Sequence, residues 1–123
     1  MVKIMVVDSE EHVRLLYNEE LRDAGYFSVV LVETPFRLME RIASEKPDII
    51  IIGVRLLDYD PWVVLADIRK NFPHTEIIFN TSREEYWPLA REMGVRHFAR
   101  KSSNLSDLLK EIGSIIENDL FVS

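Results

Sequence analysis

Residues 46–53, KPDIIIIG, constrain the fold more than any other part of the chain. They place four consecutive isoleucines between a helix-breaking proline and a glycine. A short, continuous run of branched apolar residues is typical of a strand buried on both faces. Such strands belong to parallel sheets, in which every strand-to-strand connection needs a crossover segment, usually a helix. The sequence therefore predicts a parallel sheet with helices packed on each side.

Strand-like and helix-like segments alternate along the rest of the chain. We expect strands over residues 3–7, 27–32, 48–53, 75–81 and 95–99, and helices over 10–25, 34–46, 60–72, 83–93 and 104–120. Five such β-α units predict an α/β, doubly wound, flavodoxin-like fold with strand order 2-1-3-4-5 and five helices on both faces. We expect one domain over residues 1–123, with a tail at 118–123 that is frayed or leads to a removed segment.

Three helix starts carry recognisable signals. Thr34 and Asp60 each precede a proline, and a capping side chain followed by proline at the first helical position favours helix initiation there. Ser9 is the expected N-cap of the first helix. Pro88 lies inside the fourth helical segment, so that helix either begins late, near Trp87, or is kinked, which makes residues 82–87 irregular.

Composition limits the classes of partner and compartment. The net charge is −6, which disfavours binding of nucleic acid by this domain alone. The chain contains no cysteine, so disulfides and thiolate metal sites are excluded. No apolar stretch reaches the roughly 20 residues that a membrane span needs. We expect a cytoplasmic, globular protein that does not enter a membrane.

Polar residues follow the ends of the predicted strands. Asp8 and Ser9 follow the first strand, Gly53 the third, Thr81 the fourth and Lys101 the fifth. In an open parallel sheet, ligand sites lie beyond the carboxyl ends of the strands, near the point where the strand order reverses. These residues should therefore converge on one site, with Gly53 at its centre.

The motifs VVDSEE, KPDIIIIGVRLLDYDP, IIFNTS and FARKS occur in the order found in the receiver domain of two-component response regulators, and the chain resembles that family over nearly all its length. The resemblance implies an aspartate that accepts a phosphoryl group at the position of Gly53, and two metal-binding acids at the positions of Asp8 and Ser9. It also implies a switch made by Thr81 and Phe98, and a site lysine at Lys101.

Two of the three expected acids are missing, because glycine and serine occupy their positions. Glycine offers no nucleophile, and Asp8 alone is a poor ligand set for Mg²⁺. We therefore expect a degenerate receiver that is not phosphorylated by the usual route, needs no cofactor, and is not an enzyme. Asp8 is then expected to form an ion pair with Lys101. Asp58 or Asp60 could act as a substitute acceptor, and a small anion could bind between Lys101 and Thr81.

Receivers signal through the surface made by the fourth helix, fifth strand and fifth helix. Tyr86, Trp87, Arg96 and Arg100 are the candidate partner-binding residues there, although the two aromatic residues could equally pack in the core. The resemblance implies protein partners from a signalling pathway, such as a histidine kinase, an output domain or a second copy of the chain.

Two alternative functions remain open at this point. One is a working phospho-receiver that uses an unusual acid. The other is a sensor of small ligands or anions, which would bind in a cavity over Gly53. Tyr59 and Trp62 are large apolar groups near that position, and we expect them to fill the space above the site.

Overall fold

The computed structural model describes residues 1–120 and contains one parallel sheet with strand order β2-β1-β3-β4-β5. The strands are β1 (Lys3–Val7), β2 (Ser28–Val32), β3 (Ile49–Ile52), β4 (Glu76–Thr81) and β5 (His97–Arg100). The predicted fold class and strand order are confirmed. Residues 121–123, the end of the predicted tail, lie outside the described residues.

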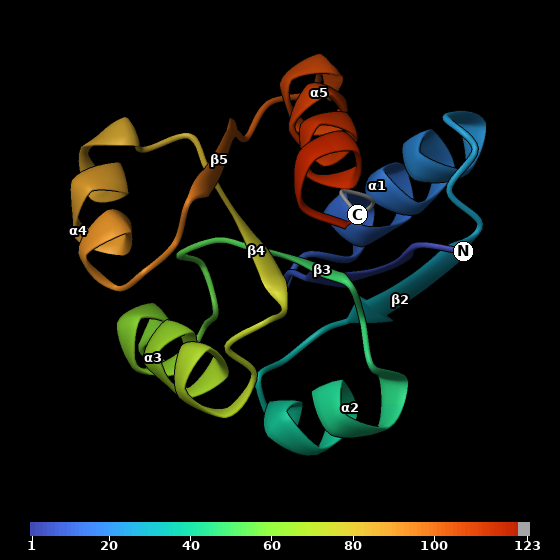
Figure 1. The fold of residues 1–123 in the computed structure, drawn as a ribbon. Coiled ribbons are helices and arrows are strands. Elements are labelled where there is room, and N and C mark those ends of the chain that lie inside the picture. The colour runs from blue at the N-terminus through green and yellow to red at the C-terminus, as the bar shows by residue number, and fades with distance from the viewer. Residues whose placement is uncertain (121–123) are drawn as a thin grey trace.

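Helices cover both faces of the sheet. They are α1 (Glu11–Asp23), α2 (Leu38–Glu45), α3 (Pro61–Asn71), the 3₁₀ turn η1 (Glu84–Tyr86), α4 (Trp87–Glu92), α5 (Ser106–Ile115) and the π-helical turn η2 (Ile116–Leu120). Figure 1 shows α2, α3 and α4 on one side of the sheet and α1 and α5 on the other.

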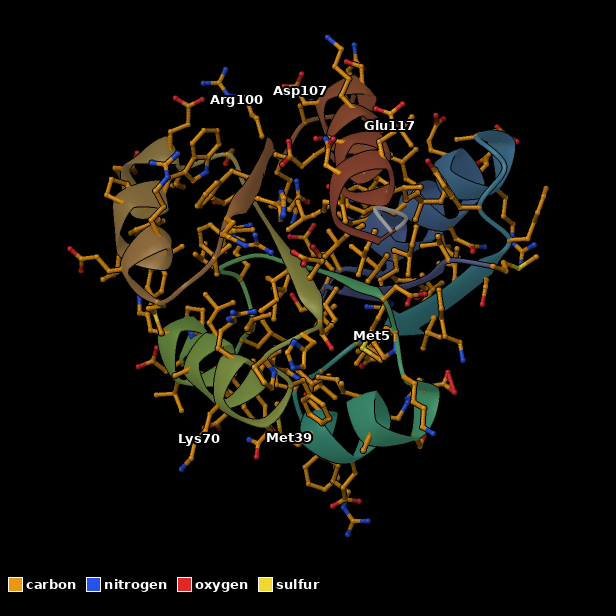
Figure 2. The ribbon with its side chains drawn as sticks, in the orientation of Figure 1. Met5, Met39, Lys70, Arg100, Asp107 and Glu117 are labelled. Carbon is orange, nitrogen blue, oxygen red and sulfur yellow. The ribbon has the colours of Figure 1, made fainter. Side chains whose placement is uncertain are left out.

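The isoleucine run forms β3, the central strand, and serves both layers of the core. Ile49 and Ile51 pack with α1 and α5, whereas Ile50 and Ile52 pack with α2 and α3, as the period of two in a strand requires. All four side chains are at most 1% exposed. Burying each contributes roughly 1.5–3 kcal/mol, which explains why this segment anchors the sheet. Figure 2 shows Met5 of β1 in the interior on the α2 side.

The two predicted proline-led helix starts differ in outcome. Asp60 caps α3 as predicted, because its side chain accepts a hydrogen bond from the Trp62 backbone N–H at 2.9 Å. The prediction for Thr34 is wrong. Its hydroxyl accepts from the Phe36 N–H in a local turn, Arg37 adopts a left-handed conformation with φ 55°, and α2 begins only at Leu38. Local side-chain bonding therefore competes with helix initiation at this site.

The fourth helical segment begins late, as one of the two alternatives for Pro88 predicted. Residues 84–86 form a 3₁₀ turn, and Pro88 is the second residue of α4, where its missing N–H has no intrahelical partner to lose. At the other end, Gly94 adopts φ 89° and the Val95 N–H donates to the Ala90 carbonyl. Val95 therefore belongs to a helix cap, and β5 begins two residues later than predicted.

No helix within residues 1–120 combines the length and the apolar character needed to cross a membrane.

Candidate functional site

A cavity of about 800 Å³ opens beyond the carboxyl ends of the strands. We call it the strand-end cavity. Its wall is formed by the first half of α1, the loop after β3 with the start of α3, the end of β4 with the η1 turn, and the loop after β5. Among the residues that line it are Tyr17, Trp62, Thr81, Tyr86 and Lys101. The volume lies within the range of small-molecule sites in proteins.

Asp8 and Lys101 form an ion pair at the base of this region. Lys101 Nζ donates to Asp8 Oδ2 at 2.7 Å, and the Asp8 side chain is only 10% exposed. The other carboxylate oxygen, Oδ1, accepts from the Glu10 backbone N–H at 2.8 Å. The predicted contact is therefore present, and both carboxylate oxygens of Asp8 are already engaged.

Ser9 does not cap α1, contrary to the prediction. The residue preceding α1 is Glu10, which makes no side-chain cap, and the Ser9 hydroxyl donates to the Arg55 carbonyl at 3.2 Å instead. The Arg55 guanidinium in turn lies 3.3 Å from a carboxylate oxygen of Glu10. The Asp8 carboxylate accepts from the Glu10 N–H, outside the helix, so no side chain caps α1. Ser9 thus ties the loop after β3 to the start of α1.

The backbone at Gly53 leaves no room for a side chain. A Cβ built on Gly53 would approach the carbonyl oxygen of Asn80 to under 3.0 Å, closer than real Cβ atoms come to other groups. The obstacle is backbone of the neighbouring strand β4, which cannot rotate away as the end of a side chain could. The Gly53 backbone thus closes against the β4 backbone and leaves no space for a side chain.

Asn80 and Tyr17 complete the buried polar part of the site, and sequence reasoning missed both residues. The Tyr17 hydroxyl donates to Asn80 Oδ1 at 2.6 Å, and Asn80 Nδ2 donates to the Ala99 carbonyl at 3.0 Å. Asn80 is 4% exposed. The one sequence signal for this site was the amide of Asn80, which follows three apolar residues in the segment IIFN of β4. The pair links α1, β4 and β5 directly beneath the cavity.

Burial raises the pKa of Tyr17 to about 12, and the nearby Asp8 carboxylate adds to the rise, while the hydrogen bond to Asn80 opposes it. The folded state keeps the phenolic proton to higher pH than the unfolded state. Tyr17 therefore adds stability that is fully present below pH 10 and is lost between about pH 10 and pH 12, up to roughly 3 kcal/mol.

We expect Tyr17→Phe to show this in urea unfolding. At pH 7 the variant should be about 1 kcal/mol less stable, because the bond to Asn80 is lost. Between pH 9 and pH 12 its stability should fall less steeply than that of the wild type. Other titrating groups are common to both proteins, so a parallel decline of the two curves would contradict the assignment.

Thr81 and Phe98, the predicted switch residues, have structural partners. The Thr81 hydroxyl accepts from the Arg83 backbone N–H at 3.1 Å. The Phe98 ring is half-buried between Phe79 and Trp87, with centroid distances of 6.4 and 5.4 Å, and the Arg91 guanidinium lies 4.7 Å from its centroid. Thr81 lines the strand-end cavity, whereas Phe98 does not line it.

The two aromatic partner candidates, Tyr86 and Trp87, are half-buried against the core on the α3 and α4 side. Tyr86 packs on Trp62 at 5.7 Å, and Trp87 packs on Phe98. The Trp87 indole N–H is buried without a hydrogen-bond partner in residues 1–120. The sequence left open whether these aromatic side chains lie on the partner surface or pack against the core, and in the structure they pack against the core.

The two basic candidates, Arg96 and Arg100, are exposed and ion-paired. Arg96 contacts both carboxylate oxygens of Glu76, at 2.9 and 3.1 Å. Arg100 contacts Glu84 at 2.8 Å and points outward at the end of β5 in Figure 2. The Arg100–Glu84 pair is exposed on both sides and contributes little to stability, whereas the Glu76 side chain that holds Arg96 is only 13% exposed. Both guanidinium groups are themselves exposed and can be reached by a partner.

The prediction for the aromatic residues near Gly53 is only partly right. Trp62 lines the strand-end cavity and packs on Phe79 at 5.7 Å. Tyr59 lies elsewhere, in a second cavity between α2 and α3. The side chains of Tyr59 and Trp62 therefore leave the space above the strand ends open, as the 800 Å³ cavity.

The residues present do not fit a Mg²⁺ ion. Mg²⁺ prefers octahedral oxygen ligation with carboxylates among the ligands. The site holds two acids, Asp8 and Glu10. The Asp8 oxygens are held by Lys101 and by the Glu10 N–H, and the Glu10 carboxylate pairs with Arg55 and contacts His12. The Ser9 hydroxyl donates to a carbonyl. The ammonium group of Lys101 neutralises the charge that would attract the ion.

Comparison with known proteins decides the family. The sequence profile of the response regulator receiver domain matches residues 4–113. This chain belongs to the response regulator receiver family. The fold and the position of the strand-end cavity agree with that membership.

Among curated relatives, the receiver is similar to the transcriptional regulatory protein YxdJ of Bacillus subtilis, with 30% identity over 118 residues that cover 94% of this chain and 51% of YxdJ. It is also similar to the alkaline phosphatase synthesis transcriptional regulatory protein PhoP of the same organism, with 26% identity over 93% of this chain and 48% of PhoP. The chain thus spans about half the length of these relatives.

Solved structures agree with the receiver fold. The response regulator TrrA of Thermotoga maritima, in complex with Mg²⁺ and BeF, superimposes with a TM-score of 0.83 and 26% identity, covering 94% of this chain and 99% of TrrA. The chemotaxis protein CheY4 of Vibrio cholerae gives a TM-score of 0.83 at 22% identity, covering 94% and 98% of the two chains. The second likeness concerns the fold alone.

Proposed function

We propose that this receiver does not accept a phosphoryl group at the end of β3 and that it acts in the cytoplasm by binding protein partners. In this proposal it is not an enzyme, it needs no Mg²⁺, and its partner surface is the α4/β5/α5 face with Arg96 and Arg100. A histidine kinase, an output domain or a second copy of the chain are the partner classes to test.

The single observation that carries the proposal is the closure at Gly53. Phosphoryl transfer to a receiver needs a carboxylate nucleophile. Position 53 has no side chain, and the Asn80 carbonyl occupies the space that a Cβ would need. The Asp8–Lys101 ion pair supports the proposal independently, because it satisfies the remaining acid without a metal or a phosphoryl group.

Asp58 and Asp60 are poor substitutes as acceptors. Both are exposed, and neither lines the strand-end cavity. Asp60 is committed to capping α3. A nucleophile needs an aligned phosphoryl donor and electrostatic stabilisation of the transition state. The Asp58 and Asp60 side chains face the cavity between α2 and α3, not the strand-end cavity where Lys101 lies.

The test is incubation with acetyl phosphate and Mg²⁺ followed by intact-mass spectrometry. We expect no mass increase by one phosphoryl group, while a receiver with an aspartate at the end of β3 serves as the positive control. A base-labile adduct on the wild-type chain would overturn the proposal. If the double variant Asp58→Asn, Asp60→Asn then lost the adduct, the unusual-acid alternative would hold.

A second candidate function rests on the strand-end cavity, which could hold a small anionic ligand. The cavity offers aromatic surface on Trp62 and Tyr86 and positive charge on Arg55 and Arg83. The Glu10 carboxylate also lines it, and the charge of Lys101 is matched by Asp8. Arg55 and Arg83 are 79% and 60% exposed in their present ion pairs, so they could exchange a protein carboxylate for a ligand phosphate at little cost.

Thermal unfolding in the presence of inorganic phosphate, ATP and GTP tests this candidate. A ligand that binds only the folded state raises the melting temperature in a concentration-dependent way. The rise should disappear in Arg83→Gln, which removes a cavity cation, and should persist in Arg96→Gln, which removes an exposed cation outside the cavity. If neither phosphate nor ATP nor GTP raises the melting temperature, the strand-end cavity is not a site for these anions and this candidate function fails.

A further inference from the structure

Exposed apolar side chains gather beside α2 and α3, away from the α4/β5/α5 face. Phe36, Leu57, Tyr59 and Val63 are 63%, 80%, 36% and 56% exposed. The other large exposed apolar residues of the described chain are Met1 and Phe27, which precede β1 and β2, Leu15 on α1 and Leu89 on α4. A concentration of apolar surface on one side of a domain points to a contact with another molecule.

A cavity of about 370 Å³ lies within this surface, and we call it the α2–α3 groove. Its apolar lining comprises Pro35, Leu38, Met39, Tyr59, Val63 and Val64. Figure 2 places Met39 on α2, where that helix approaches α3. The groove is therefore bounded by two helices and by the loop after β3, and it is separate from the strand-end cavity, with which it shares no lining residue.

The rim of the groove is acidic. Four carboxylates line it, from Glu40, Asp58, Asp60 and Asp67, against the single cation Arg37. Arg37 is paired with Glu40 at 4.0 Å, whereas Asp58 and Asp67 have no cationic partner within residues 1–120. An apolar floor with uncompensated negative charge around it is complementary to a ligand that is apolar in the middle and basic at its edges.

The loop beside the groove holds Leu57 in a conformation that its side chain does not explain. Leu57 has a left-handed backbone with φ 53°, which bulky residues rarely adopt, and its apolar side chain projects into solvent. Burial of the Leu57 side chain therefore does not account for this backbone conformation. Such outliers are found where a segment is shaped for a contact.

We propose that the α2–α3 groove binds a basic amphipathic helix of a partner protein. Apolar residues at positions i, i+3 or i+4, and i+7 of that helix occupy the groove, and its flanking Lys or Arg residues face Asp58 and Asp67. Charge complementarity decides against a second copy lying groove to groove, because the acidic rims would face each other. This contact goes beyond the proposed function, since it uses a different face and needs no phosphorylation chemistry.

The probe is a synthetic peptide of about 18 residues, or five helical turns, with leucines along one face and lysines on both flanks. The comparison peptide has the same composition, with the leucines dispersed around the helix. Titration of the ¹⁵N-labelled full chain should shift the amide signals of Arg37, Met39, Tyr59 and Val63. Fluorescence anisotropy of the labelled peptides gives the affinities at physiological salt.

Two variants test the two halves of the contact. Val63→Glu places a charge on the apolar floor and should weaken binding by about tenfold or more. The double variant Asp58→Asn, Asp67→Asn should weaken binding by a similar factor and flatten its salt dependence. The matched control is Leu15→Glu, at an exposed apolar position of α1 on the opposite side of the sheet, which should leave the affinity unchanged. Circular dichroism checks that each variant is folded.

Four results would overturn the proposal: no binding of the amphipathic peptide, equal binding of the dispersed peptide, signal shifts confined to α1 or to the α4/β5/α5 face, or no effect of Val63→Glu. Sedimentation of the chain alone adds a fifth. Self-association that Val63→Glu abolishes would make a second copy the occupant in place of a partner helix. A phosphoryl adduct at another site would defeat the proposed function and leave this inference standing.

Discussion

Replacing Gly53 by alanine should lower the free energy of unfolding by about 3 kcal/mol, which is large for the addition of one methyl group. The new Cβ would collide with the Asn80 carbonyl oxygen, so the end of β3 or of β4 has to move. Overpacking of a well-packed interior costs about 1–3 kcal/mol, and a backbone obstacle places this case at the upper end. Urea unfolding of wild type and variant measures the difference.

Gly113 is the matched control. It lies in α5, and a Cβ added there meets no atom within 4 Å, so Gly113→Ala should stabilise the protein by about 0.5–1 kcal/mol through helix propensity. Gly53→Asp should be at least as destabilising as Gly53→Ala and should gain no phosphoryl group from acetyl phosphate. A stable Gly53→Asp protein that becomes phosphorylated would show that only the carboxylate, and not the space for it, had been lost.

Replacing Lys101 by methionine should cost about 2–3 kcal/mol. The Asp8 carboxylate is 10% exposed, and without the ammonium group it would keep only the Glu10 N–H as a hydrogen-bond donor. Removing one partner of a fully buried pair costs about 3–5 kcal/mol, and the 24% exposure of Lys101 reduces that figure here. Chemical unfolding near pH 7 measures the loss.

A double-mutant cycle separates the ion pair from the packing of the lysine chain. Asp8→Asn keeps an acceptor for the Glu10 N–H and removes the charge, so adding it to Lys101→Met should restore most of the lost stability. Arg55→Met serves as the comparison, because the pair of Arg55 with Glu10 lies at the exposed rim. This substitution should lower the free energy of unfolding by less than about 0.5 kcal/mol. Equal losses from Lys101→Met and Arg55→Met would contradict a special role for Asp8.

Much of the fold could be predicted because its signals are local and repeated. The isoleucine run specified a strand buried on both faces, and five β-α alternations left few topologies. Errors occurred where two local signals competed. Thr34 could cap a helix or close a turn, and the choice depended on Arg37 adopting a left-handed conformation. Residue types alone do not rank such alternatives.

Part of the site could also be predicted, because parallel strands bring their carboxyl ends to one edge of the sheet. The convergence of Asp8 and Lys101 follows from that rule. The connection of Asn80 to Tyr17 does not, because it joins residues 63 positions apart on a strand and a helix. Nor does sequence separation reveal that Tyr59 and Trp62, three residues apart, line different cavities.

The sequence by itself determined which chemistry is absent, since a glycine at position 53 can present no nucleophile in any conformation. Only the tertiary structure decided whether space for a nucleophile remains. That space depends on the distance between two strand backbones, which the packing of both helical layers sets. The same packing decides which apolar side chains are left exposed, so the α2–α3 groove could be seen only after the chain was folded.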